Sequence, residues 1–461
     1  MRIAMPHTTW IQKRDASARA SVAAASRAVG GRAGIIKDVL NLMIEPDDPR
    51  LFHAVTDVTD TAWLYGRGGR GENGATGNGG GAGLTSELAI ASAIGETIER
   101  TCSSIYDQRS LVVSSYADLQ RVGKRAVSPY SFALFSDRQY SRPDFAYHRF
   151  SEDLVVSWAY GYSLAKEEPI LVPACLVYLP YKYEHHDDLI ADGVSTGLCC
   201  ARSVPEAILG GLYEVIERDA IMIMWMNKLP CPRLNPSSDL WLSTLLQERF
   251  GPSGLILSIN DISTDIPIPV VFGLLVDEQN EGIAVTVGAA ANLNAEEAAL
   301  KALVEAAQGR LWIKHIERRR GIRKYREDFS DVESFEDHVR LFGSLDKIPY
   351  VDFLLRSPVE RDILSVQTLG AMEPAQDLRK CVDTLAAKGL DVIAVNLTQP
   401  DVEELGFHVV KVLVPGLVDI NAHHSYPLLG AMRLYSVPRL LGYKDRDTRE
   451  DEMNPHPHPF P

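Results

Sequence analysis

One short phrase occurs twice in this chain of 461 residues, and it restricts the possible fold more than any other feature. Residues 92–100 and 210–218 both end in Glu-x-x-Glu-Arg, within apolar residues at helical spacing. The pattern predicts two helices, over 85–103 and 204–225, packed against a core. On a helix, residues three apart share one face at about 5–6 Å between Cβ atoms. Two pairs of converging carboxylates result: Glu96 with Glu99, and Glu214 with Glu217.

Four carboxylates on two half-buried helices repel one another unless cations lie between them. Hard divalent cations such as Mg2+ prefer oxygen ligands. The residues therefore favour a metal-binding role for both pairs. The alternative is a pair of surface helices whose Glu and Arg side chains form ordinary salt bridges, and the repetition within a matching apolar frame makes this alternative the weaker one.

A third segment extends the pattern. When the predicted helix over 295–316 is aligned with the second copy, Glu297 falls at Glu206, Glu305 at Glu214, and Gln308 at Glu217. A strand, a glycine-containing turn and an acidic helix therefore recur three times. This predicts an α/β (α+β) fold of internally repeated strand–helix units whose helices aim carboxylates at a shared site. For the third copy, a chance likeness between Ala/Glu/Leu-rich helices stays open.

Composition excludes several classes of protein. A net charge of -14 argues against nucleic acid as the main partner, since phosphate binding needs a basic face. No apolar run approaches the length that a membrane span requires. The six cysteines are scattered without a C-x-x-C pair, which is typical of a reduced, cytoplasmic protein without a zinc site or a disulfide framework.

The rest of the chain divides into four parts. We predict an N-terminal helical extension (1–34), a core (35–330), a C-terminal α/β part (331–443) and a flexible tail (444–461). The extension contains a helix over 16–29 and resembles a transit peptide in composition, but a helix used for packing or partner contact is favoured. Strands are expected over 35–42, 51–58, 111–115, 154–162, 170–178, 255–259, 270–276, 283–288, 390–395 and 407–414.

Two polar segments invite a binding interpretation. The glycine-rich run over 66–83 is too entropically costly for a strand or helix interior, so we expect a mobile loop, with a phosphate cradle as the alternative. It lacks a P-loop pattern. The run His185-His186-Asp187-Asp188 is expected to be an exposed loop, because contiguous residues cannot all face one ion.

The chain ends in alternating prolines, Asn454-Pro-His-Pro-His-Pro-Phe-Pro461. Alternating proline holds a segment extended at about 3.1 Å per residue, with little entropy left to lose on docking. Such a segment can thread into a cleft and place the carboxylate of Pro461 there. A disordered end is the alternative.

Taken together, these motifs resemble the YcaO family over residues 35–461. The resemblance rests on Gly83-Leu-Thr, Ser92-x3-Glu96-x2-Glu99-Arg100, Ser195-Thr-Gly-Leu198, Glu206-x7-Glu214-x2-Glu217-Arg218, Lys301-x3-Glu305-x2-Gln308-x-Arg310, Val414-Pro-Gly-Leu417 and the Pro-x-Pro-x-Pro end. It implies a YcaO-type fold in which the helices line a cleft for ATP and Mg2+ without a P-loop.

The resemblance also implies residue roles. Glu96, Glu99, Glu214 and Glu217 would be Mg2+ ligands. The nucleotide would contact Ser92, Arg202, Glu206, Arg218, Lys301, Glu305, Gln308 and Arg310. Three positions depart from the family pattern: Ala82 stands where Lys is usual, Arg202 where Asn is common, and Lys301 where Arg is common. Lysine keeps the charge but loses the bidentate fork of arginine.

A Pro-x-Pro-x-Pro end is the mark of members that form azolines. The implied function is an ATP-dependent cyclodehydratase that converts Cys, Ser or Thr residues of a ribosomal precursor peptide into thiazolines or oxazolines, with the carboxylate of Pro461 moving protons. The expected partners are that peptide, a leader-binding E1-like or winged-helix subunit in a hetero-oligomer, and a flavin-dependent azoline dehydrogenase. Two alternatives stay open: an ATP-dependent peptide thioamidating enzyme, and a nucleotide-binding scaffold without chemistry of its own.

Overall fold

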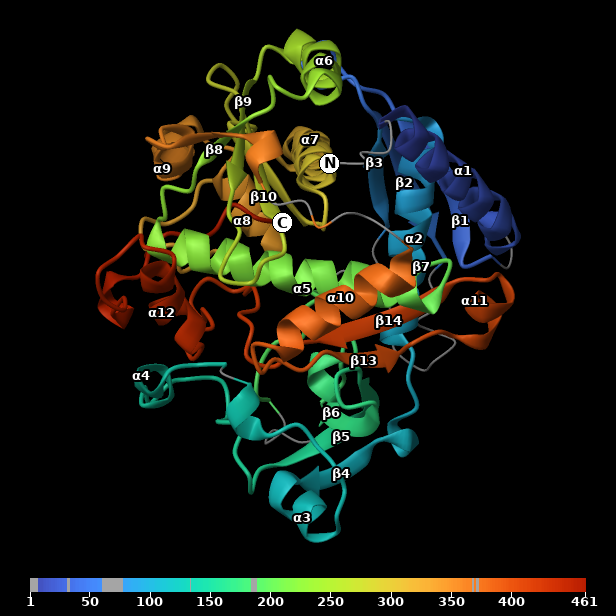
Figure 1. The fold of residues 1–461 in the computed structure, drawn as a ribbon, viewed down its shortest axis with the longest axis vertical. Helices are drawn as coiled ribbons and strands as arrows, with labels where there is room; N and C mark the ends of the chain where they lie inside the picture. Colours follow the sequence, from blue (N-terminus) through green and yellow to red (C-terminus); the bar gives the residue numbers. More distant parts are fainter. Residues whose placement is uncertain are drawn as a thin grey trace.

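The computed structural model describes residues 7–30, 34–59, 78–132, 134–183, 189–366, 369 and 373–461. Its strands form three sheets, and helix α5 (Val204–Asn227) runs across the middle of the molecule between two of them (Figure 1). Most of α5 is buried, including its whole second half. A helix that is apolar on nearly all sides needs cover on all sides, and this explains its central place.

The first sheet is antiparallel, with strand order β1 (Ile36–Leu42), β2 (Phe52–Val58) and β3 (Gly80–Gly83). Helix α2 (Ser86–Ser104) packs on this sheet, and α1 (His7–Ala25) packs on α2. In Figure 1 this layer forms the blue edge of the molecule.

The second sheet has the order β11 (Val285–Ala291), β10 (Val270–Val276), β9 (Ile256–Asp261), β8 (Arg233–Asn235) and β12 (Glu360–Asp362). Strands β10 and β11 are buried at every position, because both α7 (Ala295–Arg320) and α5 pack against them. Continuous burial on both faces accounts for their mostly apolar sequences, in which Thr286 is the exception.

The third sheet has the order β4 (Val112–Ser115), β5 (Val155–Ser163), β13 (Ile393–Asn396), β14 (His408–Leu413) and β7 (Leu198–Ala201), and β6 (Glu168–Pro173) also pairs with β5. Strands β13 and β14, from after residue 331, therefore lie between strands from before it, β5 and β7. The remaining helices are α3 (Tyr116–Arg121), α4 (Asp137–Tyr140), α6 (Leu240–Arg249), α8 (Phe335–Leu341), α9 (Asp352–Leu355), α10 (Pro374–Ala386), α11 (Pro400–Glu404) and α12 (Met432–Leu440).

The predicted threefold repeat is present. Strand β3 leads into α2, β7 into α5, and β11 into α7, and the three helices begin after the capping residues Thr85, Ser203 and Asn294. Each cap's side-chain oxygen accepts a hydrogen bond from the main-chain N–H of the third helical residue. Each helix also packs on the strand of the next unit: α2 on β7, α5 on β11, and α7 on β3. The three units therefore close into a ring with their acidic helices around one centre.

The glycine-rich run gives a correction. Residues 80–83 form strand β3 and pair with β2, so the prediction that the run contains no strand is wrong there. A Cβ atom on Gly81 would lie 2.1 Å from the carbonyl oxygen of Ala89 on α2. Glycine is thus required for the close approach of strand and helix. Residues 66–77 and the run His185–Asp188 lie outside the described residues.

Other boundaries differ by a few residues from those expected. Helix α7 continues to Arg320, because its basic last turn complements the negative end of the helix dipole. The strand expected over 170–178 ends at Pro173, where a 3-10 turn follows. The N-terminal helix begins earlier, at His7, and ends at Ala25.

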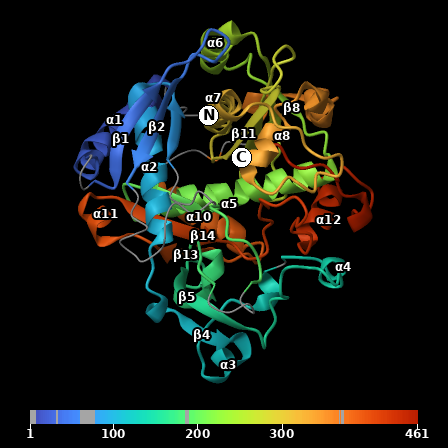
Figure 2. The ribbon, with the colours of Figure 1, turned by 180° about the vertical axis from the view of Figure 1, so that it is seen from behind.

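The C-terminal tail is packed and not flexible at its end. The Trp225 Nε1–H group donates to the carbonyl oxygen of His456 at 3.1 Å, and the His458 ring stacks on the His338 ring at 3.8 Å between centroids. Phe460 is fully buried. Figures 1 and 2 both place the C-terminus close to α8, inside the outline of the molecule. The expectation of a flexible tail is therefore wrong for these residues.

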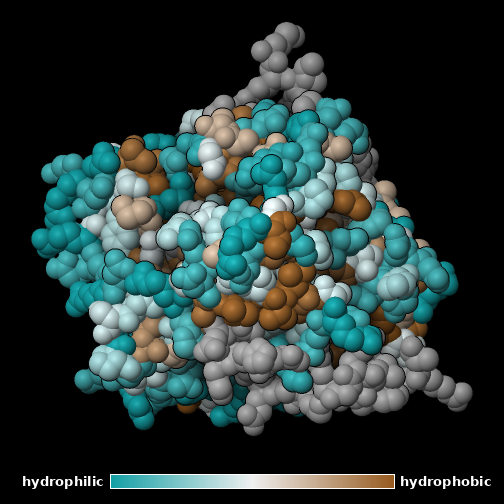
Figure 3. Space-filling view, turned by 90° about the horizontal axis from the view of Figure 1, so that it is seen from below, coloured by the Kyte–Doolittle hydropathy of each residue, from teal (hydrophilic) through white to brown (hydrophobic). Residues whose placement is uncertain are grey.

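The lobe that carries β4, β5 and β6 lies at the lower end of Figure 1. From below, hydrophobic side chains gather near the centre of the molecule's face among hydrophilic ones (Figure 3). Exposed apolar side chains of this lobe include Val113, Val122 and Val155.

No helix in the described part of the chain is both long and apolar enough to cross a membrane.

Candidate functional site

Three glutamates occupy the same place in the three repeats. Glu96, Glu214 and Glu305 each follow the first residue of their helix (Ser86, Val204 and Ala295) by ten positions. Each carboxylate accepts a hydrogen bond from a main-chain N–H of the strand or turn that precedes its helix. The donors are Gly80 at 2.8 Å, Gly197 at 3.0 Å and Ala289 at 3.1 Å. The repeat therefore fixes one carboxylate per unit at the centre of the ring.

The next set lies three residues further along each helix: Glu99, Glu217 and Gln308. Burial raises the pKa of Glu99 well above its ordinary value, and the nearby charges of Glu214 and Glu96 add to the effect. Burial likewise raises the pKa of Glu217 to about 8, reinforced by the charge of Glu305. These mutual effects place the carboxylates of three separate stretches together. We call Glu96, Glu99, Glu214, Glu217, Glu305 and Gln308 the carboxylate centre.

Gln308 closes the ring between the third and first units. A Cβ atom on Gly80 would lie 3.0 Å from the Gln308 amide nitrogen and 3.9 Å from Glu96 Oε2. Gln308 therefore lies beside the first carboxylate, as expected from the alignment of the three helices.

Arg218 is the cation at the edge of this centre. Its Nη2 lies 3.3 Å from Glu214 Oε1, and its Nε lies 3.9 Å from Glu217 Oε1. Its guanidinium covers the ring of Phe460 at 4.1 Å. The side chain is buried, and its Nε and Nη1 have no hydrogen-bond partner among the described residues. A buried N–H group without an acceptor is costly, so this guanidinium is suited to an additional anion.

The arrangement fits a metal-bound triphosphate. Burial raises the pKa of Glu305 as well, although Arg218 and Lys301 oppose this effect. The raised pKa values of Glu99, Glu217 and Glu305 show that desolvation outweighs the effect of the nearby Arg and Lys side chains. Hard divalent cations, which prefer oxygen ligands, would compensate the carboxylate charge. Phosphate oxygens would accept hydrogen bonds from the Arg218 nitrogens that have no partner among the described residues.

Other predicted nucleotide contacts lie at the rim of the centre. Ser92 is exposed on the face of α2 that carries Glu96 and Glu99, and its Cβ would lie 2.9 Å from a Cβ on Gly81. Lys301 is exposed on α7, one turn before Glu305. The charges of Glu206 and Lys301 both act on the Cys199 thiol, whose pKa burial raises to about 12.

Arg202 is already engaged elsewhere. Its Nη1 donates to the carbonyl oxygen of Leu405 at 2.8 Å, and its guanidinium lies 4.8 Å from the Phe407 ring centroid. These contacts hold Arg202 against the turn between α11 and β14.

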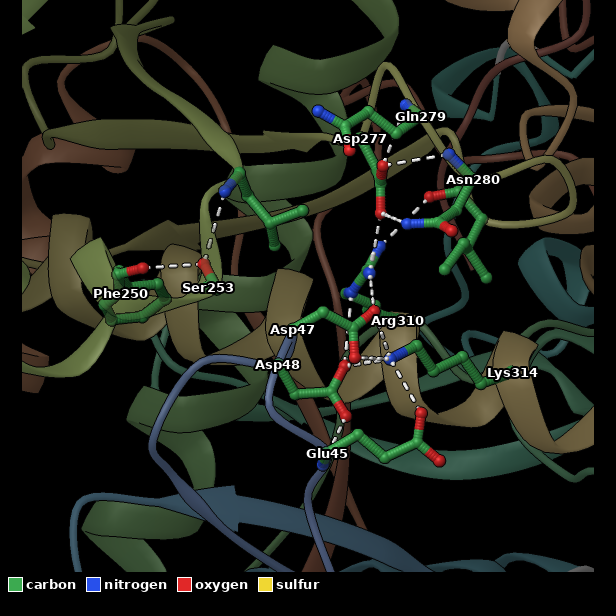
Figure 4. A network of polar contacts seen from close by, with 12 residues as sticks. Glu45, Asp47, Asp48, Phe250, Ser253, Asp277, Gln279, Asn280, Arg310 and Lys314 are labelled. Carbon is green, nitrogen blue, oxygen red and sulfur yellow. Dashed lines mark hydrogen bonds and ion pairs between the residues drawn. The ribbon is translucent and has the colours of Figure 1, made fainter.

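The structure does not place Arg310 with the carboxylate centre, which corrects that part of the expected site. Its Nη2 pairs with Asp47 and Asp277, both at 2.8 Å, and its Nε pairs with Asp48 at 3.2 Å (Figure 4). Arg310 is five residues beyond Glu305, which is about 140° around the helix at 3.6 residues per turn. It therefore lies on the other side of α7 and stabilises the fold.

The same network explains a cluster of three acids. Glu45, Asp47 and Asp48 offer oxygens that lie within 4.8 Å of one another. Lys314 Nζ lies 2.6 Å from Asp48 and 2.9 Å from Asp47, so the cluster already holds its own cations, Arg310 and Lys314 (Figure 4). An ion pair of this kind fixes the β1–β2 connection to α7.

Two charged residues of the site were missed by the sequence analysis. Lys411 on β14 is 2% exposed, and its Nζ donates to the carbonyl oxygen of Val194 at 2.6 Å. Burial lowers the pKa of Lys411 to about 8, although the charges of Asp419, Glu214 and Glu99 oppose this effect. Burial raises the pKa of Asp419 despite Lys411. The available signal was a lone lysine inside an apolar strand.

Pro461 follows Phe460 and is half-buried. The preceding residue, Phe460, is the one whose ring contacts Arg218.

Comparison with known proteins identifies a family model. The model described as YcaO cyclodehydratase, ATP- and Mg2+-binding, matches residues 80–418. An uncharacterized protein of Methanothermobacter thermautotrophicus is 28% identical over 265 residues, which are 57% of this chain and 65% of that protein. A protein from Rhizobium leguminosarum bv. trifolii, named only as uncharacterized in the tfuA 3' region, is 28% identical over 294 residues, covering 58% of this chain and 63% of its own length. The chain thus spans somewhat less than two thirds of both relatives.

Solved structures share the fold. A heterocyclase in complex with substrate and cofactor has a TM-score of 0.76 at 22% identity, over 96% of this chain and 57% of its own. The heterocyclase TruD has a TM-score of 0.62 at 24% identity, over 82% of this chain and 52% of its own. The YcaO protein of Methanopyrus kandleri, bound with AMPPCP and Mg2+, has a TM-score of 0.58 at 20% identity, over 91% and 92% of the two chains. These likenesses confirm the predicted YcaO-type fold of repeated strand–helix units.

Proposed function

The chain belongs to the YcaO family of ATP- and Mg2+-binding cyclodehydratases, and from this premise we propose that it converts Cys, Ser or Thr residues of a ribosomal precursor peptide into thiazolines or oxazolines. One observation carries the proposal. Three helices of a closed ring each fix a glutamate at the same position, and a buried arginine lies at their edge with two nitrogens that have no hydrogen-bond partner among the described residues.

We assign the four repeated glutamates to the metal. Glu96, Glu99, Glu214 and Glu217 would hold Mg2+, which when bound neutralises charge on phosphate oxygens. Arg218 and Lys301 would bind the phosphates, and Ser92, Glu206, Glu305 and Gln308 would line the nucleotide cleft. Arg202 remains a proposed contact only through the donors that Leu405 does not use.

The proposed reaction requires positioning more than it requires a nucleophile on the protein. The side-chain sulfur or oxygen of the peptide attacks the carbonyl carbon of the preceding residue and forms the C–S or C–O bond. The attacking S–H or O–H group loses its proton in this step. The γ-phosphoryl group of ATP then transfers to the former carbonyl oxygen, and ADP leaves. Finally the C–O bond to phosphate breaks, the amide N–H loses its proton, and a C=N bond forms. Phosphoryl transfer of this kind depends on alignment and charge neutralisation, and the ring of carboxylates with Arg218 is built for both.

Two protons must be removed in this reaction. We propose that the carboxylate of Pro461 helps to accept them, because its neighbour Phe460 is fixed against Arg218. A variant extended by one glycine after Pro461 moves that carboxylate. It should lose ring formation and keep nucleotide binding, and full activity of the extended protein would remove this assignment.

We propose that the protein works with partners. A solved structure of the same fold is described as the E. coli microcin synthetase McbBCD complex with pro-MccB17 bound. We infer that the precursor peptide of the present chain is presented by a leader-binding, winged-helix or E1-like subunit in a hetero-oligomer, and that a flavin-dependent dehydrogenase oxidises the azolines.

The test uses the full chain with ATP, Mg2+ and a cysteine-containing candidate peptide, read by mass spectrometry and by phosphate release. Loss of the mass of one water per ring, with one phosphate released for each, supports the proposal. Exchange of oxygen for sulphur in the presence of sulfide indicates a thioamidating enzyme instead. An unchanged peptide with tight nucleotide binding, when the leader-binding subunit is also present, indicates a scaffold. Glu217→Gln should abolish ring formation in the first case.

A further inference from the structure

A cavity of about 80 Å3 lies between the carboxylate centre and the β4–β6 lobe. Its walls come from five separate parts of the chain: the segment after the short helix at Pro129–Ser131, the 3-10 turn that follows β6, the loop before β7, helix α5, and β14 with the loop that follows it. The apolar lining includes Leu134, Leu176, Val215, Leu417, Ile420 and Leu428. A metal ion or a phosphate group needs polar ligands, so a cavity with this largely apolar lining is suited to a different ligand.

The cavity shares a wall with the carboxylate centre. Val215 lines it, and the adjacent residue of α5 is Glu214, one of the repeated carboxylates. Lys411 and Asp419 line it too, and the charge of Lys411 interacts with those of Glu214 and Glu99. A molecule in the cavity therefore lies next to the groups that would hold the triphosphate.

The polar part of the lining consists of Asp192, Thr196, Lys411 and Asp419. The Thr196 Oγ1 atom is buried and has no hydrogen-bond partner among the described residues. Lys411 Nζ uses one of its three donors on the Val194 carbonyl oxygen. A donor and an acceptor side by side match the C=O and N–H of a peptide backbone, and the apolar remainder matches an uncharged side chain.

The size of the cavity agrees with one peptide residue. At about 10–15 Å3 of such volume per water molecule, it has room for roughly five to eight waters, or about 150–240 Å3 of liquid. That is the volume of a residue with a large apolar side chain.

Resting on the proposed function, we infer that this cavity binds the side chain of the substrate residue whose carbonyl is attacked, the residue just before the Cys, Ser or Thr that closes the ring. The site selects an uncharged apolar side chain at that position. Lys411 is a positioning residue that donates to the peptide backbone at the inner end. A charged side chain is disfavoured, because Lys411 and Asp419 already interact with each other and most of the remaining lining is apolar.

The test is photo-crosslinking with a defined probe. An acetylated and amidated tetrapeptide, Gly-(photo-leucine)-Cys-Gly, is irradiated with the full chain, AMPPCP and Mg2+, and the adduct is mapped by mass spectrometry. Adducts on the segments that carry Leu134, Leu176, Leu417 or Leu428 support the inference. Unlabelled Gly-Leu-Cys-Gly should compete at least tenfold better than Gly-Asp-Cys-Gly. Adducts elsewhere, or equal competition by both peptides, would overturn it.

A pair of matched variants sharpens the result. Leu428→Trp fills the cavity from its half-buried rim and should reduce adduct formation at least tenfold. Leu440→Trp makes the same change on exposed α12, outside the cavity, and should leave the adduct unchanged. The mapping with the unaltered chain decides the matter even if Leu428→Trp does not fold.

Crosslinking requires no turnover, so the two proposals can fail separately. Ring formation with adducts outside the cavity would leave the cyclodehydratase proposal standing and remove the cavity assignment. Adducts in the cavity without ring formation would do the reverse.

Discussion

Two replacements of Phe460 separate its contribution to stability from its contribution to nucleotide binding. The ring is fully buried, lies 6.4 Å from the Phe272 ring, and carries the Arg218 guanidinium at 4.1 Å from its centroid. Phe460→Ala removes the packing and the stacking together. Phe460→Leu keeps most of the apolar volume and removes only the aromatic face.

The structure sets the expected magnitudes. A buried Phe→Ala change costs about 3–5 kcal/mol of unfolding free energy. A desolvated cation–π contact contributes about 0.5–2 kcal/mol, so Phe460→Leu should cost about 1–2 kcal/mol. Because the ring holds the guanidinium in place, Phe460→Leu should also weaken AMPPCP–Mg2+ binding by about tenfold, which corresponds to 1.4 kcal/mol.

Urea unfolding and calorimetric titration of the full chain measure the two effects. The matched control is Phe342→Leu, because Phe342 is equally buried but packs edge-to-face against Trp225 and not against an arginine. It should cost similar stability and leave nucleotide binding unchanged. In a double-mutant cycle with Arg218→Met, the nucleotide effects of the two changes should not add. The reasoning fails if Phe460→Leu binds nucleotide as tightly as the unaltered protein, or if Phe460→Ala costs less than 1 kcal/mol.

Three further outcomes are expected. Burial raises the pKa of Glu217 to about 8, so the metal-free folded state binds more protons than the unfolded state between about pH 4.5 and 8. Its stability should therefore fall as pH rises through that window. Thermal shift assays should show that Mg2+ stabilises the protein more at pH 8 than at pH 6, and that this difference is smaller in Glu217→Gln. Arg310→Met should cost about 3–5 kcal/mol in urea unfolding by leaving buried carboxylates unpaired, against less than about 1 kcal/mol for the exposed Arg318→Met. Gly81→Ala should lower the free energy of unfolding by about 1–3 kcal/mol, because the added Cβ would lie 2.1 Å from the α2 backbone. In the same urea assay, Gly95→Ala should raise the free energy of unfolding by about 0.5–1 kcal/mol, because its Cβ would meet nothing within 4 Å.

The repeated acidic helices could be predicted because their signal is local. Glu96 and Glu99 are one helical turn apart, as are Glu214 and Glu217, so periodicity alone placed each pair on one face. The third unit followed from alignment, since Glu305 stands at the same position of its helix as Glu214. Each of these inferences needed only a short window of sequence.

The errors came from tertiary contacts or from neglected local geometry. Lys411 joins the site only because β14 pairs with β7 beside α5, which no local pattern reports. The end of the tail is ordered because His338 and Trp225 lie where it passes. Arg310 is different: motif spacing suggested a nucleotide contact, although the helical angle from Glu305 already placed it on the opposite side of α7.

The ring of three units is nearly symmetric in backbone but not in charge, and this difference orients the site. At the seventh, eleventh and fourteenth helical positions, α2 carries Ser92, Glu96 and Glu99, and α5 carries Gly210, Glu214 and Glu217. In α7 the same positions carry Lys301, Glu305 and Gln308, so the third unit has a net charge of zero where the others have two negative charges. On the proposed assignment, cations would therefore lie between α2 and α5, and Lys301 of α7 with Arg218 of α5 would form the side that binds the phosphate oxygens. A repeat that supplied three identical acidic faces would bind metal without orienting a triphosphate. Because one copy carries Lys301 and Gln308 in these positions, the centre would bind a triphosphate in only one orientation. The cavity lined by Val215 lies against α5, the helix that carries Glu214 and Glu217.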